Sequence, residues 1–339
     1  MKQFIFLVCS ERSGSNFITA LMNGHSRISG PPPTHLFRLF ASNSDRYGDL
    51  SDDRNWQTLV ADFSENLGNS LGAWNTKSTA ESLMAAKLDR DIASLLRCVY
   101  EREADSDQAS HLFVKENHSY EFAPFLLAQF QGCRFLFSVR DPRDVALSWK
   151  RTKSIPGGIT KAIDVWLQDQ QKSVELHSQL RASGMIYAVR YEDLLIQTEV
   201  ELEKILLWLG LEYETEMMAF HEHTRTKNNA SRIDAWKNTG MSIMRDNSAK
   251  YLSGLTRDEI RYIELRCSDL METFGYELEN EDIEHLNSDE RLAESARVCR
   301  SFSDGEYILD ANERRIRERR LNGISKVLGR RSARLFQTP

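Results

Sequence analysis

The chain has 339 residues, of which 41% are hydrophobic, and a formal net charge of −6. This length and composition suit a globular protein with one large α/β domain or two modest ones, and the acidic balance speaks against a nucleic-acid partner. The five cysteines are odd in number and widely spread, which argues against a disulfide framework or a zinc site and favours a reducing, cytoplasmic compartment.

The first predicted element is a strand over residues 3–9, because this run is continuously apolar and rich in Phe, Ile and Val. The run is too short to cross a bilayer, and it lacks the basic region and cleavage site of a secretory signal. We therefore expect no transmembrane segment. A polar loop follows, and then a helix is expected over residues 15–23.

Three further apolar runs, at residues 111–114, 133–139 and 185–189, are separated by helical patterns. Strands that alternate with helices predict a three-layer α/β/α fold with a central parallel sheet. Asp141 and Pro142 are expected to cap and start the helix after the third strand. Residues 42–53 read as a surface loop near the substrate entrance, and Thr256 with Glu259 predicts a capping box for a helix that ends at Gly275.

The last thirty residues differ in composition, with nine Lys or Arg against three Asp or Glu between residues 310 and 339. Their apolar positions have roughly helical spacing, which predicts an amphipathic helix that packs on the body or on another subunit. A contact with an acidic surface or a membrane is the alternative. The apolar positions are Ile316, Leu321, Ile324, Leu328 and Leu335.

The first polar constellation is the stretch Ser10 to Phe17, between the first strand and its helix. A helix N-terminus offers unpaired N–H groups and a partial positive charge, so this loop, which contains Arg12 and Gly14, predicts a cradle for an anion. A tight strand-to-helix turn without any binding role would contain the same small residues. The loop lacks the GxxxxGK[ST] pattern, which argues against an ordinary P-loop ATPase or GTPase.

The second constellation follows the strand at 133–139. Arg140 stands at the strand end and Ser148 lies about two helical turns later, so a guanidinium and a hydroxyl can converge on one phosphate. The plainer interpretation is an ion pair between Arg140 and Asp141 or Asp144 across the helix start.

Together these loops resemble those of the nucleotide-dependent sulfotransferases. The resemblance rests on the Arg-Ser-Gly-Ser loop, the run Arg140-Asp141-Pro142-Arg143-Asp144-Val145 with Ser148, and three later matches. It covers about residues 3–278 and implies a sulfotransferase domain at 1–278 with a P-loop-NTPase-like fold, followed by a helical C-terminal extension at 279–339 with a basic tail. The later matches are Tyr191-Glu192-Asp193-Leu194, Arg232 with Trp236-Lys237, and Phe274-Gly275-Tyr276.

The resemblance implies that the donor is 3′-phosphoadenosine 5′-phosphosulfate (PAPS). Arg140 and Ser148 match the pair that binds the 3′-phosphate, and Arg12 matches the basic residue that neutralises charge on the bridging oxygen. Tyr191 matches a tyrosine near the nucleotide, and Arg232 and Lys237 lie in the late loop that closes over the donor, although its Arg-Lys-Gly triplet is missing here. The residues matching the 5′-phosphosulfate loop are Arg12, Ser13, Gly14, Ser15, Asn16 and Phe17.

The general base is left with three candidates. In many relatives a Lys-Thr-His run supplies a histidine, but here the stretch reads Lys115-Glu116-Asn117-His118, so the histidine lies one residue late. In carbohydrate-modifying relatives a glutamate precedes a His-aromatic pair, and here prolines take its place before His35. His118 and His35 therefore rank close together, followed by Glu116, and Lys115 either stabilises the transferring group or pairs with Glu121.

The resulting hypothesis is transfer of a sulfuryl group to a hydroxyl of a carbohydrate or small metabolite, without a metal. The alternatives are a kinase-like enzyme that uses ATP and magnesium, and a non-catalytic protein that binds the nucleotide. No nucleic-acid partner is expected, and the C-terminal extension could join two copies of the chain.

Overall fold

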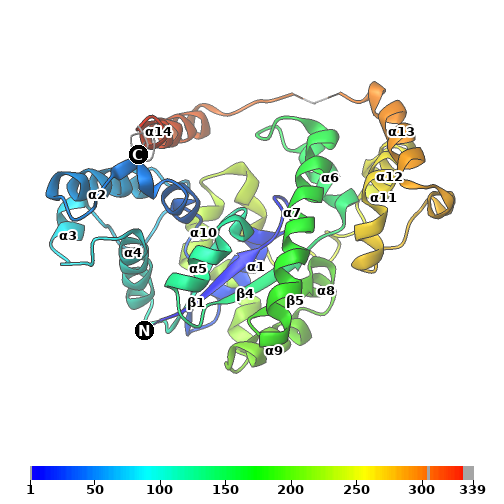
Figure 1. The fold of residues 1–339 in the computed structure, drawn as a ribbon. Coiled ribbons are helices and arrows are strands. Elements are labelled where there is room, and N and C mark those ends of the chain that lie inside the picture. Colours follow the sequence, from blue (N-terminus) through cyan, green and yellow to red (C-terminus); the bar gives the residue numbers. More distant parts are fainter. Residues whose placement is uncertain (1, 304–305, 331–339) are drawn as a thin grey trace.

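The computed structural model describes residues 2–303 and 306–330, and these form a layered α/β structure. Its centre is a five-stranded parallel sheet in the order β2-β3-β1-β4-β5, as the arrows of Figure 1 show. The predicted alternation of strands and helices is confirmed. The strands are β1 (Gln3–Val8), β2 (Ile28–Ser29), β3 (His111–Lys115), β4 (Arg134–Val139) and β5 (Ile186–Arg190).

The register of the sheet places β1 at its middle. Gln3 pairs with His111 of β3, and Ile5 pairs with Arg134 of β4. Because all the strands are parallel, their carboxyl ends and the loops that follow lie along one edge. In sheets of this kind, ligands bind in the crevice outside the carboxyl ends of the strands. The fold thus directs attention to the loops after β1, β3, β4 and β5.

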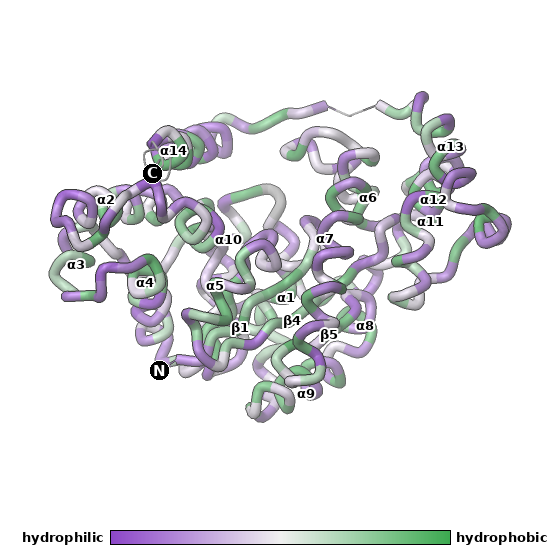
Figure 2. Tube along the Cα trace, in the orientation of Figure 1, coloured by the Kyte–Doolittle hydropathy of each residue, from purple (hydrophilic) through white to green (hydrophobic). Residues whose placement is uncertain are grey.

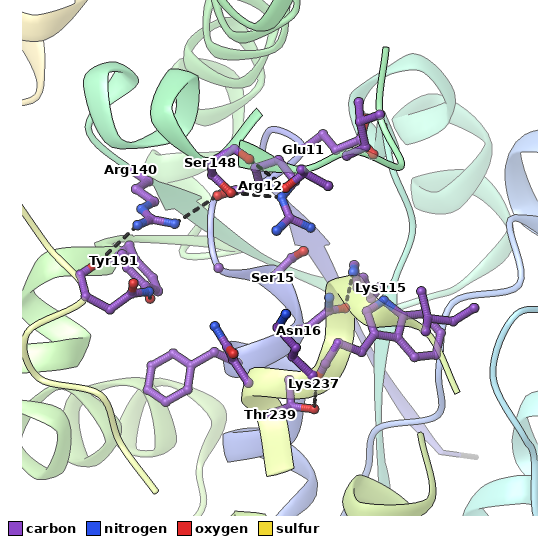
Figure 3. A pocket seen from close by; sticks show the side chains of 18 of the residues that line it. Glu11, Arg12, Ser15, Asn16, Lys115, Arg140, Ser148, Tyr191, Lys237 and Thr239 are labelled. Atoms are coloured by element: carbon purple, nitrogen blue, oxygen red, sulfur yellow. Dashed lines mark hydrogen bonds between the residues drawn. The ribbon is translucent and has the colours of Figure 1, made fainter. Parts of the chain in front are cut away.

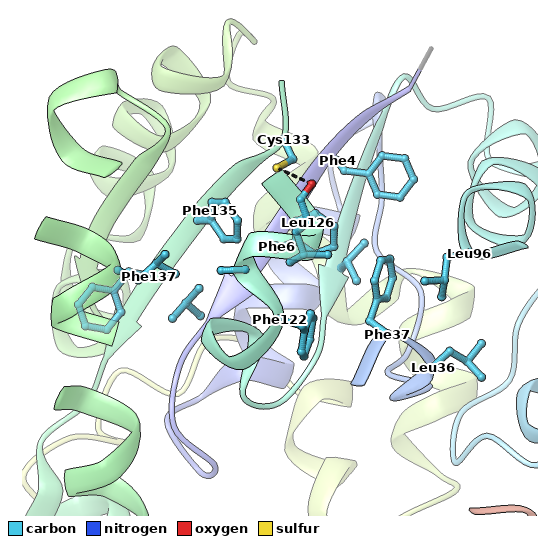
Figure 4. Packing of buried hydrophobic residues seen from close by; sticks show 14 of the residues in the cluster. Phe4, Phe6, Leu36, Phe37, Leu96, Phe122, Leu126, Cys133, Phe135 and Phe137 are labelled. Carbon is cyan, nitrogen blue, oxygen red and sulfur yellow. Dashed lines mark hydrogen bonds between the residues drawn. The ribbon is translucent and has the colours of Figure 1, made fainter. Parts of the chain in front are cut away.

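Alternate residues of β1 enter two different cores. Phe4, Phe6 and Val8 lie in the larger core, whereas Ile5 and Leu7 lie in the smaller core on the opposite face. This arrangement explains why the strand is apolar at every position. Figure 4 shows the aromatic part of the larger core, where the rings of Phe4 and Phe130 have their centroids 4.8 Å apart.

Helices cover both faces of the sheet, and the strands are largely apolar in Figure 2 while the surrounding helices carry the polar residues. Side chains from α4, α5, α6, α7 and α12 pack in the larger core, and those from α1, α8 and α9 pack in the smaller one. The helices that complete these layers are α1 (Ser15–Asn23), α4 (Ile92–Ser106), α5 (Ala123–Gln129), α6 (Pro142–Arg151), α7 (Gly158–Leu180), α8 (Tyr191–Ile196), α9 (Thr198–Leu209) and α12 (Arg257–Thr273).

Two predicted helix starts are confirmed. The Asp141 side chain accepts a hydrogen bond from the backbone N–H of Arg143 at the start of α6. Thr256 and Glu259 form the predicted capping box of α12. The prediction for residues 42–53 differs in detail, because a 3-10 helix occupies Ser44–Tyr47 and the Tyr47 side chain is buried. The edge strand β2 was not predicted, because two residues are too few to show a pattern.

The C-terminal extension folds back onto the body. It contains α13 (Ser288–Val298), a linker, and α14 (Ala311–Leu328), and Figure 1 shows α14 beside α2 (Asp53–Gly68). The predicted helix on the body is confirmed, but its buried face is not the predicted stripe, because Leu321 and Leu328 are exposed while Val327 is buried. Leu335 lies outside the described residues. The remaining helices are α3 (Ala80–Met84), α10 (Thr224–Ala230) and α11 (Tyr251–Gly254).

Candidate active site

A cavity of about 480 Å³ opens at the carboxyl edge of the sheet, a size typical of sites for small molecules. Its walls come from the loops after β1, β3, β4 and β5, from residues 233–250, and from α14. Among the residues predicted for the site, those that line it are Arg12, Gly14, Ser15, Asn16, Phe17, His35, Lys115, Arg140, Ser148, Tyr191 and Lys237.

The loop after β1 bends sharply where it meets α1. Arg12 has φ 66° and Gly14 has φ 82°, so both lie in the left-handed region. A Cβ atom at Gly14 would lie 2.2 Å from Cε2 of Tyr191, which only glycine avoids. No side chain caps α1, so the N–H groups of its first turn are directed at the cavity end of the loop and favour an anion there.

Arg140 connects the loop after β4 with the loop after β1. Its guanidinium donates to the backbone carbonyl of Arg12 at 3.1 Å and to that of Asn247 at 3.0 Å. It also lies over the Tyr191 ring, 4.5 Å from the centroid. The alternative ion pair with Asp141 is not formed, because Asp141 binds Arg143 at 2.7 Å instead.

Ser148 joins the same group from α6. Its hydroxyl oxygen accepts a hydrogen bond from Nε of Arg12 at 3.0 Å. Figure 3 shows Ser148 and Arg12 next to each other, with Arg140 and Tyr191 on one side of them and Lys115 on the other. Two loops that are more than 120 residues apart in the chain thus supply one continuous, positively charged surface.

Lys115 marks the other side of the cavity. It lies at the end of β3, and its ammonium donates to the side-chain carbonyl of Asn16. Burial lowers the pKa of Lys115 to about 8. The alternative pairing with Glu121 is not formed, because the Glu121 carboxylate lies 3.5 Å from Arg38 and 3.5 Å from His118.

The three candidates for the general base occupy different environments. His35 lines the cavity, and its Nδ1 lies 3.8 Å from the carboxylate of Glu116. Burial and nearby cations hold the pKa of His35 well below its usual value. Glu116 is buried behind it and does not line the cavity, and burial raises its pKa to about 8.

His118 lies outside the cavity lining. Its Nδ1 is 2.9 Å from the Tyr120 hydroxyl and 3.4 Å from the Asp169 carboxylate. Asp169 also accepts a hydrogen bond from the Ser10 hydroxyl at 2.8 Å, so this network supports the loop after β1 from behind. Asn117 lines the cavity in its place.

The remaining predicted residues differ in whether they line the cavity. Ser13 is buried and its hydroxyl lacks a hydrogen-bond partner, but it does not line the cavity. Arg232 donates to the backbone carbonyl of Leu71, a lining residue, at 3.2 Å but does not itself line the cavity, whereas Lys237 in the same late loop lines it.

Several lining residues were missed in the sequence, among them Asn247 and Arg317. Asn247 donates to the Tyr191 hydroxyl at 2.8 Å and accepts from Arg140 through its carbonyl, and no local motif marks it. Arg317 comes from α14, and the basic composition of the tail was the only signal for it.

Within residues 2–303 and 306–330, no group of three or more His, Cys, Asp or Glu side chains is placed to hold a metal ion. The search of the same residues for a helix long and apolar enough to cross a membrane also found none.

Comparisons with known proteins agree with this fold. The model of the sulfotransferase family matches residues 4–215. A sulfotransferase domain from the curacin biosynthetic pathway is 20% identical with a TM-score of 0.56, covering 82% of this chain and 99% of that chain. A sulfotransferase domain from the Synechococcus PCC 7002 olefin synthase is 20% identical with a TM-score of 0.59, and the match covers 82% of this chain and 97% of that chain. A search of curated protein sequences found no match.

Proposed function

The chain belongs to the sulfotransferase family, and from this premise we propose that it transfers a sulfuryl group from PAPS to a hydroxyl of a small-molecule or carbohydrate acceptor. The observation that carries the proposal is the hydrogen bond from Arg140 to the carbonyl of Arg12 at 3.1 Å. It brings the two turns that match the donor-binding loops of the family to one place. A single ligand with phosphate groups at both ends can therefore contact both turns.

The donor end of the cavity supplies binding groups for two anions. The N–H groups at the start of α1, with Ser15 and Asn16, would hold the 5′-phosphosulfate. Arg140 and Ser148 would hold the 3′-phosphate through charge-assisted hydrogen bonds. Because Gly14 has no side chain, the Tyr191 ring can pack directly against the backbone of this loop.

In the transfer, the bond between sulfur and the bridging oxygen breaks while a bond forms between sulfur and the acceptor oxygen. Negative charge then develops on the leaving phosphate oxygen, where Arg12, Lys115 and Lys237 supply positive charge from the cavity wall. Fixed cations stabilise this charge without reorganising, as in phosphoryl transfer. The acceptor loses its hydroxyl proton in the same step and needs a base to receive it.

We assign the base to His35. It lines the cavity, and its lowered pKa keeps the imidazole neutral, and so able to accept a proton, at neutral pH. Glu116, 3.8 Å behind it, is a positioning residue, and His118 serves the network behind the loop.

The test is a transfer assay with ³⁵S-labelled PAPS, a panel of hydroxylated acceptors and EDTA. Labelled product in the presence of EDTA supports the proposal. Activity that requires ATP and magnesium would instead identify the kinase-like alternative, and binding of 3′-phosphoadenosine 5′-phosphate (PAP) without transfer to any acceptor would identify a nucleotide-binding protein.

A further inference from the structure

Helix α14 is held in a defined position on the body. Lys326 forms ion pairs with Asp62 at 3.1 Å and with Glu65 at 2.7 Å, both on α2. Val327 is fully buried in the larger core. A Cβ at Gly323 would lie 2.8 Å from Oδ1 of Asn66, so the two helices touch closely there. These contacts fix which face of α14 is turned toward the cavity.

The linker before α14 passes beside the cavity rim. The backbone N–H of Ile308 donates to the carbonyl of Lys153 at 2.8 Å. Lys153 belongs to the turn after α6, and its neighbours Arg151, Thr152 and Ile155 line the cavity. The extension is therefore attached on both sides of the opening, through α2 and through this turn.

Two arginines lie on the same side of α14, and of the two Arg317 lines the cavity whereas Arg320 does not. The guanidinium of Arg317 is oriented by Glu313 at 2.6 Å. Arg320 follows three residues later, on the same side of the helix. Its charge is among those that lower the pKa of His35, and among the nearby cations it has the largest effect on the pKa of Glu116, which it lowers.

Glu313 balances the charge of Arg317 at 2.6 Å, whereas Arg320 has no such partner in the part of the chain that the structure describes. Among the described residues, Arg320 makes no hydrogen bond and no ion pair within 4.0 Å. The carboxyl group on which it acts, that of Glu116, is half or more protonated at neutral pH because burial raises its pKa to about 8. Lys115 and Arg38 add further positive charge around His35. An anion would be favoured here, and the donor phosphates have their binding groups at the opposite end.

We propose that Arg317 of α14 binds an anionic group of the acceptor, a carboxylate or a phosphate, and so presents its hydroxyl to His35, while Arg320 adds positive charge from behind the cavity wall. This inference rests on the proposed function and narrows it to acidic hydroxylated acceptors. It also makes the C-terminal extension part of the active site, because α14 supplies the binding group.

The experiment measures calorimetric binding of matched probes to the protein saturated with PAP. The pairs are 4-hydroxybenzoate against 4-hydroxybenzamide and glucose 6-phosphate against glucose, which separate a carboxylate from a phosphate. We expect one anionic probe to bind more tightly than its neutral partner. Arg317→Ala should weaken binding of the anionic probe roughly tenfold or more and leave the neutral partner unchanged, because it removes a charge-assisted hydrogen bond. Arg320→Ala should weaken binding of the anionic probe less, because it removes only a nearby positive charge.

Arg319→Ala is the matched control, because Arg319 is exposed on the same helix and should leave all four probes unchanged. The inference fails if neither anionic probe is preferred, if the preference survives both substitutions, or if the variants lose affinity for PAP, which would assign the arginines to the donor. Failure of the unaltered protein to bind PAP would instead contradict the proposed function.

Discussion

The two ends of the cavity are built in different ways. The donor end comes from short motifs that each follow a strand, and its central contacts join Arg12, Arg140 and Ser148. The acceptor end combines His35 from the segment after β2, Lys115 from β3 and Arg317 from α14. The geometry of the donor end depends on strand-to-helix turns. The geometry of the acceptor end depends on how distant parts of the chain pack together. Substitutions at the two ends should accordingly affect different steps.

The largest expected effect is at the acceptor end. His35→Asn should lower kcat by about 10²–10⁴-fold, because a general base contributes a factor of this size. PAP affinity should stay unchanged, since His35 is placed away from the donor contacts. Steady-state kinetics and calorimetry measure the two quantities. The matched variant His118→Asn should lower kcat less, and the reverse order would move the base to His118.

The opposite pattern is expected for Arg140→Ala. Removing this guanidinium should weaken PAP binding by roughly 2–4 kcal/mol, because a charge-assisted contact to the phosphate is lost. Titration calorimetry with PAP gives the value directly. Unchanged PAP affinity would show that the donor does not contact the turn after β4, and the division into two ends would fail.

Gly14→Ala tests the donor end through the backbone of the loop after β1. The new Cβ would meet the Tyr191 ring, 2.2 Å from Cε2, at a residue with φ 82°, so we expect PAP binding to weaken by about 1–3 kcal/mol. Gly184→Ala is the control, because Gly184 also has a positive φ of 67° but no atom lies within 4 Å of its added Cβ. It should affect stability and leave PAP binding intact. Equal effects of both changes on PAP binding would contradict the close contact.

The smallest expected effect is on how stability changes with pH, through the carboxyl group of Glu116. Its pKa is raised from 4.5 to about 8 by burial, so between these values the folded state binds more protons than the unfolded state. Its contribution to stability is complete below pH 4.5 and is lost as the pH rises toward 8. Glu116→Gln should remove this contribution, so that the melting temperature falls less between pH 5 and 8 than in the unaltered protein. If the melting temperatures of the two proteins fell equally between pH 5 and 8, the raised pKa of Glu116 would be excluded.

The sequence by itself determined the sheet and the donor end. The apolar run 3–9, the Arg-Ser-Gly-Ser loop and the Asp141-Pro142 helix start are local signals. Parallel strands bring the loops that follow them to one edge. Arg12, Arg140 and Ser148 therefore come together wherever that fold forms.

Only the tertiary structure decided the acceptor end. His35 and His118 were ranked together from the sequence, because each lies beside motif-like residues, and only the path of the chain turns His35 toward the cavity. Asn247 and Arg317 carry no local pattern, and their placement depends on how residues 233–250 and α14 pack on the body. The direction of a side chain is set by its packing partners, and here those partners lie from 56 residues away, for Asn247 and Tyr191, to 261 residues away, for Lys326 and Glu65.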